Sequence, residues 1–219
     1  MNFSFLEKYS SYYLKGAEIT IVLAFFAVLL GTVLGLCITL LRRSKIKPIS
    51  FIATAYVEFV RGTPLLVQIY IIYIGLPKLI GIELPDMTTG IVALSLNSSA
   101  YVSEIIRAGI DAVDKGQLEA ARSLGMNQRL AMFEIVIPQA FKNILPALGN
   151  EFISVIKESS MISVIGVAEL MFNAGVVRGR TALGLEPIIV AAVIYFVITF
   201  TLTRILGVVE RRLKASDIR

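Results

Sequence analysis

Several polar side chains fall inside long apolar runs of this chain, and the chemistry available to it depends on them. Six are candidate ligands for a polar solute: Glu58, Asn97, Ser98, Tyr101, Glu104 and Glu151. Asn97, Tyr101 and Glu104 follow one another at i, i+4 and i+7, so a helix would present them on one face. Polar groups inside a bilayer are costly, and this makes them functional candidates by default. Hydrogen bonding between helices is the alternative role for the same groups.

The residues that catalytic and metal sites usually need are missing from this sequence. The chain has no histidine and a single cysteine, Cys37, which excludes histidine-based catalysis and an internal disulfide. No G-x-x-x-x-G-K-[ST] motif occurs, so we expect no P-loop nucleotide site. Cys37 lies in an apolar run, where burial is expected. The sequence thus predicts no catalytic residue, no metal ligand and no cofactor.

Composition is that of a membrane protein. The 219 residues are 56% hydrophobic and 17% charged, with a mean hydropathy of +0.79. The length suits a single domain, residues 1–219, with several spans and no large soluble module. The net charge of +5 comes from Lys and Arg at the ends of apolar runs, where membrane proteins keep them. The basic balance therefore indicates lipid, and no nucleic-acid partner is expected.

Long apolar runs predict an all-α integral membrane protein with five transmembrane helices. Their ranges are 17–41, 49–80 with an interruption at 61–64, 88–110, 138–165 and 187–209. As a straight helix the second run would reach ~50 Å, whereas the hydrocarbon core is ~30 Å thick. Gly62 can end a helix there, and Pro64 can start the next one. Gly31 and Gly35 have the spacing that lets two helices approach closely.

The distribution of Lys and Arg predicts the orientation. The loop after the first span and the C-terminal tail each hold four such residues, whereas the loops assigned outside hold only Lys78, Arg178 and Arg180. Cytoplasmic loops of membrane proteins are the ones enriched in Lys and Arg. With five spans, the N-terminus is expected outside and the C-terminus in the cytoplasm. The predicted location is the cytoplasmic (plasma) membrane, which the chain crosses several times.

The polar loop 111–137, between the third and fourth spans, has its own helix signals. Asp114 with Gln117 predicts a capping box, in which Asp114 caps the amide of Gln117. Gly125 is suited to end the helix in the left-handed conformation. Asn127 can cap a second short helix, and Pro138 fits the first turn of the next span.

The same loop resembles a known signature. Its matching positions are Glu119-Ala120-Ala121, Gly125, Ile135 and Pro138. The membrane subunits of ABC importers carry a cytoplasmic loop of the form E-A-A, three residues, G, nine residues, I-x-L-P, and the departure here is Ile137 for Leu. The resemblance implies a coupling helix that docks into a separate ATPase subunit. The implied coupling residues are Glu119, Ala120, Ala121 and Gly125, and the partner would bind and hydrolyse the ATP.

Three further segments resemble the polar amino acid permease branch of the ABC importers. They are Tyr56–Gln68, Tyr101–Arg107 and Gly149–Ser160, similar to E-x-x-R-G-T-P-L-L-V-Q, A-Y-x-x-E-I-x-R and G-N-x-F-I…K-D-T-S. Glu158 and Ser159 depart from the last pattern and keep its chemistry. The resemblance implies a dimeric pore made with a second, identical or different, permease subunit. It also implies two ATP-binding subunits on the cytoplasmic side and an extracytoplasmic substrate-binding protein.

The balance of charge favours a basic substrate. Glu151 occupies the open x position of G-N-x-F-I, and the nearby cations are Arg61 and Lys157. A carboxylate in low dielectric is costly unless a cation meets it. A polar and basic amino acid is therefore predicted, arginine, lysine or histidine, with its side-chain cation near Glu151 or Glu58.

Other interpretations stay open at this point. Lys157 could neutralise Glu151, and the substrate would then be glutamine or another neutral polar amino acid. A stand-alone secondary transporter would need no ATPase, and the coupling signature argues against it. A purely structural membrane subunit would transport nothing.

Overall fold

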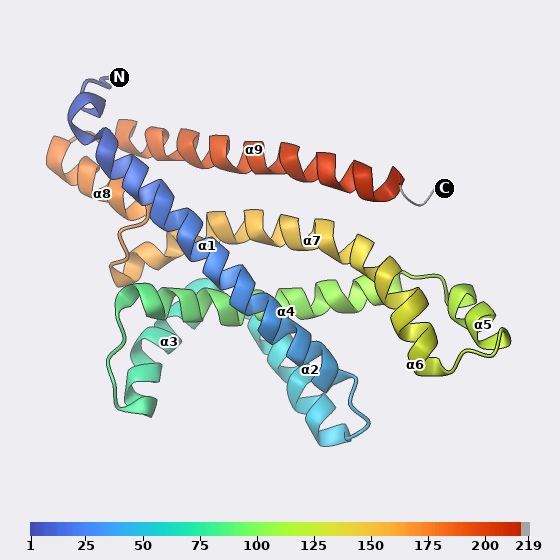
Figure 1. The fold of residues 1–219 in the computed structure, drawn as a ribbon. Helices are drawn as coiled ribbons and strands as arrows, with labels where there is room; N and C mark the ends of the chain where they lie inside the picture. Colours follow the sequence, from blue (N-terminus) through green and yellow to red (C-terminus); the bar gives the residue numbers. More distant parts are fainter. Residues whose placement is uncertain (216–219) are drawn as a thin grey trace.

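The computed structural model describes residues 1–215, and the regular elements in this part of the chain are all helical (Figure 1). In chain order they are α1 (Leu6–Arg42), α2 (Lys47–Gly62), α3 (Leu65–Ile80), α4 (Asp86–Asp111), α5 (Lys115–Ser123), α6 (Gln128–Ala131), the π-helical turn η1 (Met132–Val136), α7 (Ile137–Glu158), the 3-10 segment η2 (Ser159–Ile165), α8 (Leu170–Thr181) and α9 (Glu186–Ala215). The predicted all-α class is confirmed. The end of the predicted basic tail, residues 216–219, lies outside the described residues.

Length and composition single out part of this helix set as membrane-crossing. Among the described residues, α1 and α9 are long and apolar enough to cross a membrane alone. The number rises to four if two bent pairs each count as one span: α2 with α3, bent by 114°, and Gln128–Ile165 with α8, bent by 52°. α4 is not among these candidates, because serine, asparagine, tyrosine and glutamate interrupt its apolar residues. Such a helix needs protein neighbours for its polar side.

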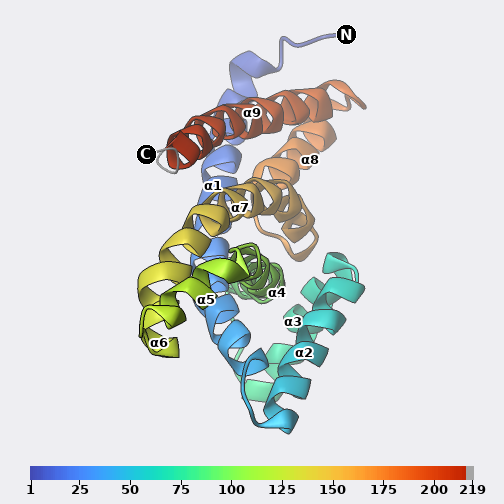
Figure 2. The ribbon, with the colours of Figure 1, turned by 90° about the vertical axis from the view of Figure 1, so that its right-hand side faces the viewer.

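α4 has those neighbours because it runs through the middle of the bundle. Figure 2 views it nearly end-on, with α1, α3 and α7 around it. Its buried polar residues are Thr89, Ser95, Asn97, Ser98, Ser99 and Ser103. α1 packs tightly against it, since a Cβ added at Gly35 would lie 2.8 Å from the Cβ of Val102. The close approach predicted from the spacing of Gly31 and Gly35 is confirmed.

The chain breaks between α2 and α3. Thr63 and Pro64 both have extended backbone conformations, and α3 starts at Leu65. Proline cannot continue a helix at that point, and it restricts the residue before it to extended conformations. The two helices consequently diverge at a sharp angle, and α2 ends beside the middle of α4.

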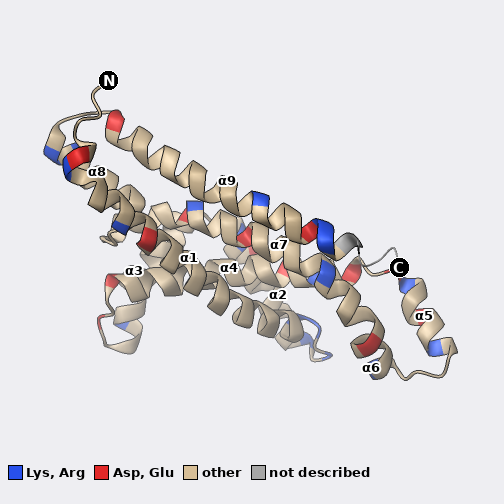
Figure 3. Ribbon diagram, turned by 45° about the horizontal axis from the view of Figure 1, so that its top comes forward, with Lys and Arg blue, Asp and Glu red and all other residues tan. Residues whose placement is uncertain are grey.

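Connections gather at the two ends of the bundle. The N-terminus, the α3–α4 connection and α8 lie toward the left of Figure 1. The α1–α2 loop, α5, α6 and the C-terminal end of α9 lie toward the right. Between these ends α1 carries no charged residue from position 19 to 41 (Figure 3). The charged residues of α1 therefore lie toward its two ends, where the helix would leave the hydrocarbon layer.

α5 ends in the turn that glycine makes possible. Gly125 has φ +88°, and the amides of Gly125 and Met126 donate to the carbonyls of Arg122 and Ala121. This is the Schellman arrangement, and it confirms the predicted glycine stop. Asn127 caps α6 through Leu130, also as predicted.

One detail of this loop differs from the sequence prediction, and another is confirmed. The carboxylate of Asp114 accepts from the amide of Gly116 at 2.7 Å, not from Gln117, because the cap here is a tight turn over two residues. Pro138 lies in the first turn of α7, as predicted, although α6, η1 and α7 follow one another without a gap. The π turn lies directly before the proline, where a missing amide donor and a ring disturb regular α-helical bonding.

The connection before α9 and the single cysteine also differ from expectation. A short helix is expected around 167–172, whereas α8 runs from Leu170 to Thr181. It begins there because the buried carboxylate of Glu169 accepts from the amides of Met171 and Phe172. Cys37 is exposed on α1, so its predicted burial is wrong for this subunit. An apolar run does not tell a lipid-facing side of a helix from a protein-facing one.

Candidate functional site

Ser98 and Glu151 join the middle of α4 to the middle of α7. The Ser98 hydroxyl donates to Oε1 of Glu151 at 2.8 Å, and Ser98 is fully buried. Within the described residues no ion pair links Glu151 to a lysine or arginine, Lys157 included. The geometry thus leaves Glu151 a half-buried carboxylate that meets a hydroxyl instead of a cation.

Asn97, one residue earlier, is held by a different helix. Its side-chain amide donates to Oε1 of Gln68 on α3 at 2.9 Å, and both side chains are buried. Gln68 also donates to the Val60 carbonyl at 2.7 Å, on the far side of the α2–α3 break. This asparagine therefore holds helices together in the present arrangement.

Glu104 lies at the centre of an arginine cluster. It contacts Arg42 on α1 at 2.5 Å, Arg107 on its own helix at 2.8 Å and Arg61 on α2 at 3.8 Å. Arg61 also lies over the Tyr101 ring, 5.7 Å from its centroid. Arg42 is 17% exposed and Arg61 45%, so Arg61 is the more accessible of these two cations. Arg61 makes its ion pair with Glu104 on α4, although Glu58 lies three residues before it on α2.

The six predicted ligands consequently form separate groups. Ser98 with Glu151 makes one, and Tyr101 with Glu104 makes another around Arg61. Asn97 belongs to the link with α3, and Glu58 is exposed on α2. Among the described residues, no group of three or more His, Cys, Asp or Glu side chains could hold a metal ion.

Sequence reasoning overlooked two residues that organise this region. Gln68 is the single amide side chain in the apolar run of α3, and that isolation is the signal that could have found it. The basic run that begins at Arg42 predicts only a cytoplasmic loop, although Arg42 is the last residue of α1 and faces Glu104. Both become visible as partners only when α4 is placed between α1 and α3.

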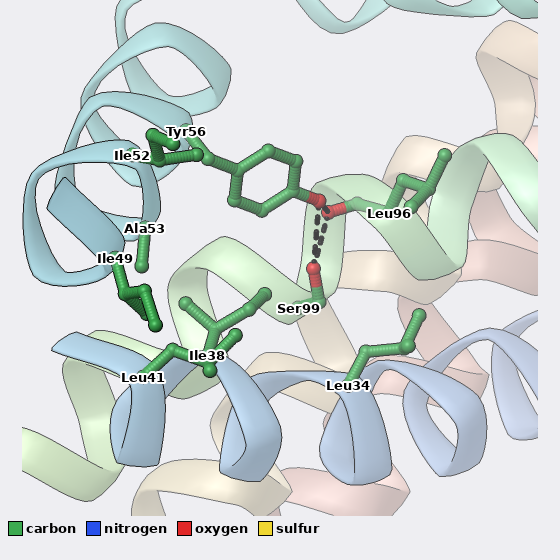
Figure 4. Close-up of a pocket in the computed structure, with 9 residues that line it drawn as sticks. All are labelled: Leu34, Ile38, Leu41, Ile49, Ile52, Ala53, Tyr56, Leu96 and Ser99. Atoms are coloured by element: carbon green, nitrogen blue, oxygen red, sulfur yellow. Dashed lines mark hydrogen bonds between the residues drawn. The ribbon is translucent and has the colours of Figure 1, made fainter. Parts of the chain in front are cut away.

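An apolar pocket lies between α1, α2 and α4. Its volume is about 370 Å³, and Figure 4 shows its lining residues Leu34, Ile38, Leu41, Ile49, Ile52, Ala53, Tyr56, Leu96 and Ser99. The Tyr56 hydroxyl reaches from α2 to the Leu96 carbonyl and to the Ser99 hydroxyl, each at 2.9 Å. Its two polar side chains are thus bonded to protein. A charged amino acid would find no partner there.

α5 and its turn project from the right-hand end of the bundle (Figure 1). Of the predicted coupling residues, Glu119, Ala120 and Gly125 are exposed, whereas Ala121 is buried. Leu124, between them, is 86% exposed.

Comparisons with known proteins place this architecture in a family. The model of the binding-protein-dependent transport system inner membrane component matches residues 27–215. The arginine transport system permease protein ArtQ of Bacillus subtilis (strain 168) is 46% identical, with 93% of each chain covered. The putative glutamine transport system permease protein GlnP of Rickettsia bellii (strain RML369-C) is 42% identical, with 98% of this chain and 100% of the relative covered.

Solved structures agree with the sequence comparisons. One described as the crystal structure of an amino acid ABC transporter with histidines matches with a TM-score of 0.91 and 51% identity, covering 97% of this chain and 100% of that one. An inward-facing MetNI methionine ABC transporter has a TM-score of 0.78 at 16% identity, covering 92% and 95%, and shows the fold alone. The chain therefore belongs to the binding-protein-dependent transport system inner membrane components and is a permease subunit of an amino acid ABC importer.

Proposed function

We propose that this permease moves a basic amino acid, arginine, lysine or histidine, into the cytoplasm by alternating access. The observation that carries the proposal is the pair Ser98 and Glu151, in which a half-buried carboxylate meets a hydroxyl and no cation of the described chain. A side-chain cation of the substrate would neutralise it. A neutral substrate would leave the Glu151 carboxylate without a cation.

The other predicted ligands supply complementary polar groups. Arg61 is accessible beside Tyr101 and suits the carboxylate that every amino acid carries. Glu58 is exposed on the same helix as Arg61 and offers a second negative group. Asn97 and Glu104 would contact the substrate only if the helix movements of alternating access released Asn97 from Gln68 and Glu104 from the arginines.

Glutamine, or another neutral polar amino acid, is the second candidate. The names of the relatives support both, since one is called an arginine permease and another a glutamine permease. The solved relative described with histidines supports the basic class. Charge at Glu151 is the feature that separates the two candidates.

We further propose that the chain is a single domain with five spans, the N-terminus outside and the C-terminus in the cytoplasm. Counting α4 as the third span is supported by its 26 residues, about 39 Å of helix, and by its buried polar face. An odd number of spans places the two ends of the chain on opposite sides of the membrane. The arrangement of the bundle supports this, because the N-terminus and α8 lie at one end and α5 lies at the other (Figure 1).

The loop 111–137 is proposed to dock into an ATPase, with α5 as the coupling helix. The exposed Leu124 and the glycine turn behind it support this role. The functional unit would then pair two permease subunits, identical or different, with two ATP-binding subunits and an extracytoplasmic binding protein. In this scheme the permease itself catalyses nothing and needs no cofactor.

The substrate proposal is tested by equilibrium binding of labelled arginine and glutamine to the purified permease–ATPase complex. Leaving the binding protein out isolates the preference of the permease. We expect tighter binding of arginine, and we expect Glu151→Gln to weaken arginine by tenfold or more while sparing glutamine. Glu83→Gln, on the exposed α3–α4 connection, is the matched control. Unchanged arginine binding in Glu151→Gln, with glutamine the better ligand throughout, would favour the neutral substrate.

A further inference from the structure

We propose that an anionic phospholipid occupies a groove between α1, α4 and α7, with its headgroup at Arg43. The groove has a volume of about 320 Å³. Leu36 and Leu40 of α1, Ile110 of α4 and Phe141 of α7 belong to its walls. Among the described residues that line it, Arg43 alone is charged. It is separate from the region of Glu151 and Arg61.

The lining of the groove favours an apolar occupant. The hydroxyls of Thr32 and Thr39 also line the groove, but they donate to the carbonyls of Val28 and Gly35 at 2.7 and 2.8 Å. Neither hydroxyl needs a partner from the occupant. Leu40 is 64% exposed and Phe141 56%, so the apolar surface is open toward its surroundings. A hydrocarbon tail fits such walls, whereas a polar ligand would lose its hydrogen bonds there.

The length of the groove matches one leaflet. From Thr32 to Arg43 the α1 axis advances roughly 16 Å, at 1.5 Å per residue. Half of a hydrocarbon core of ~30 Å is ~15 Å. A tail that reaches Thr32 therefore places its headgroup at the level of Arg43.

The positive charge at the Arg43 end of the groove favours an anionic headgroup. The Arg43 guanidinium lies 3.6 Å from Asp111, a long contact, and Asp111 also accepts from Arg107 at 3.0 Å. Arg43 is nearly half exposed and has donors to share with a phosphate. The chain from Arg42 to Lys47 holds four cations and no acidic residue. Basic clusters next to a membrane helix attract anionic lipid headgroups.

The absence of tryptophan from the sequence makes a clean test available. Phe141→Trp puts one fluorescent reporter in the groove wall. Phe25→Trp puts one on the exposed side of α1, within the stretch that carries no charge. Each variant chain is reconstituted into phosphatidylcholine vesicles that contain equal mole fractions of brominated phosphatidylglycerol or brominated phosphatidylcholine. Quenching then reports the relative association of the two lipids with each site.

We expect the Phe141→Trp reporter to favour phosphatidylglycerol on the order of fivefold, the effect of about one surface cation. Phe25→Trp should show no preference. Adding Arg43→Gln to Phe141→Trp should remove the preference, whereas Lys15→Gln, near the other end of α1, should keep it. Equal quenching by both lipids, or a preference that survives Arg43→Gln, overturns the proposal. Quenching by neither lipid also overturns it, because protein such as a second copy would then cover the groove.

Discussion

The buried side-chain amide of Asn97 on α4 donates to Gln68 on α3 at 2.9 Å. The amide nitrogen of Gln68 in turn donates to the Val60 carbonyl on α2 at 2.7 Å and to the Thr63 hydroxyl at 2.9 Å. One side chain thus ties the broken α2–α3 pair to the central helix. The angle between α2 and α3 depends on this link as well as on Pro64.

Replacing Gln68 by leucine should destabilise the fold. The change leaves Asn97 and the Val60 carbonyl without their partner, and each buried group left unsatisfied costs ~1–3 kcal/mol. We expect a lower midpoint of thermal unfolding in detergent. Gln128→Leu, on the exposed start of α6, serves as the control. Equal midpoints for the two variants would show that the link contributes nothing.

Gly35→Ala should destabilise the fold and lower the midpoint of thermal unfolding. An added Cβ would lie 2.8 Å from the Cβ of Val102 and 2.9 Å from the Ser99 carbonyl, so α1 would have to move. Overpacking of this kind costs ~1–3 kcal/mol. In the same unfolding measurement Gly207→Ala should be neutral or stabilising, since nothing lies within 4 Å of a Cβ there. Similar midpoints for both variants would contradict the close contact between α1 and α4.

The acidic residues Glu104 and Asp111 should differ in their effect on stability. Glu104→Gln removes the charge that Arg42 meets in a largely buried setting, and breaking such pairs costs ~3–5 kcal/mol when burial is complete. Asp111 is 49% exposed, and exposed pairs contribute ~0–1 kcal/mol. In urea unfolding in detergent, the midpoint of Asp111→Asn should be well above that of Glu104→Gln. The reverse order would mean that the arginine cluster does not stabilise the fold.

Gly125 should be needed for the turn that ends α5. Its φ of +88° strains any β-branched residue, although nothing lies within 4 Å of an added Cβ. Gly125→Val should therefore lower substrate-stimulated ATPase activity of the assembled complex while membrane insertion persists. Gly125→Asn should retain most of the activity, because asparagine tolerates this conformation. Full activity of the valine variant would defeat the proposed coupling role.

The five-span proposal predicts opposite sides for the two ends of α4. In a Cys37→Ser background, a cysteine at Asp86 should react with an impermeant maleimide added outside intact cells. A cysteine at Lys115 should react only after the membrane is opened, as should one at Lys45. Labelling of the cysteines at positions 86 and 115, which flank the crossing by α4, from the same side would refute the odd number of spans.

The sequence determined the features whose cause is local. Thr63 and Pro64 break the second apolar run because proline restricts its own φ and the conformation of the residue before it. Gly125 ends α5 because the turn requires a positive φ. Asn127 caps α6 because its side chain reaches an amide three residues away. Neighbouring residues suffice for each of these outcomes.

Tertiary structure decided which distant groups meet. Glu104 contacts Arg42, 62 positions away, and Ser98 contacts Glu151 across 53 positions. Spacing on one helix could group Asn97, Tyr101 and Glu104, but Asn97 bonds to Gln68 on α3. Tyr101 and Glu104 instead meet Arg61 of α2, and Glu104 also meets Arg42 of α1. The exposure of Cys37 likewise depends on which side of α1 faces the bundle. The periodicity of apolar residues does not identify the side of a membrane helix that faces the bundle, because lipid and protein interior are equally apolar.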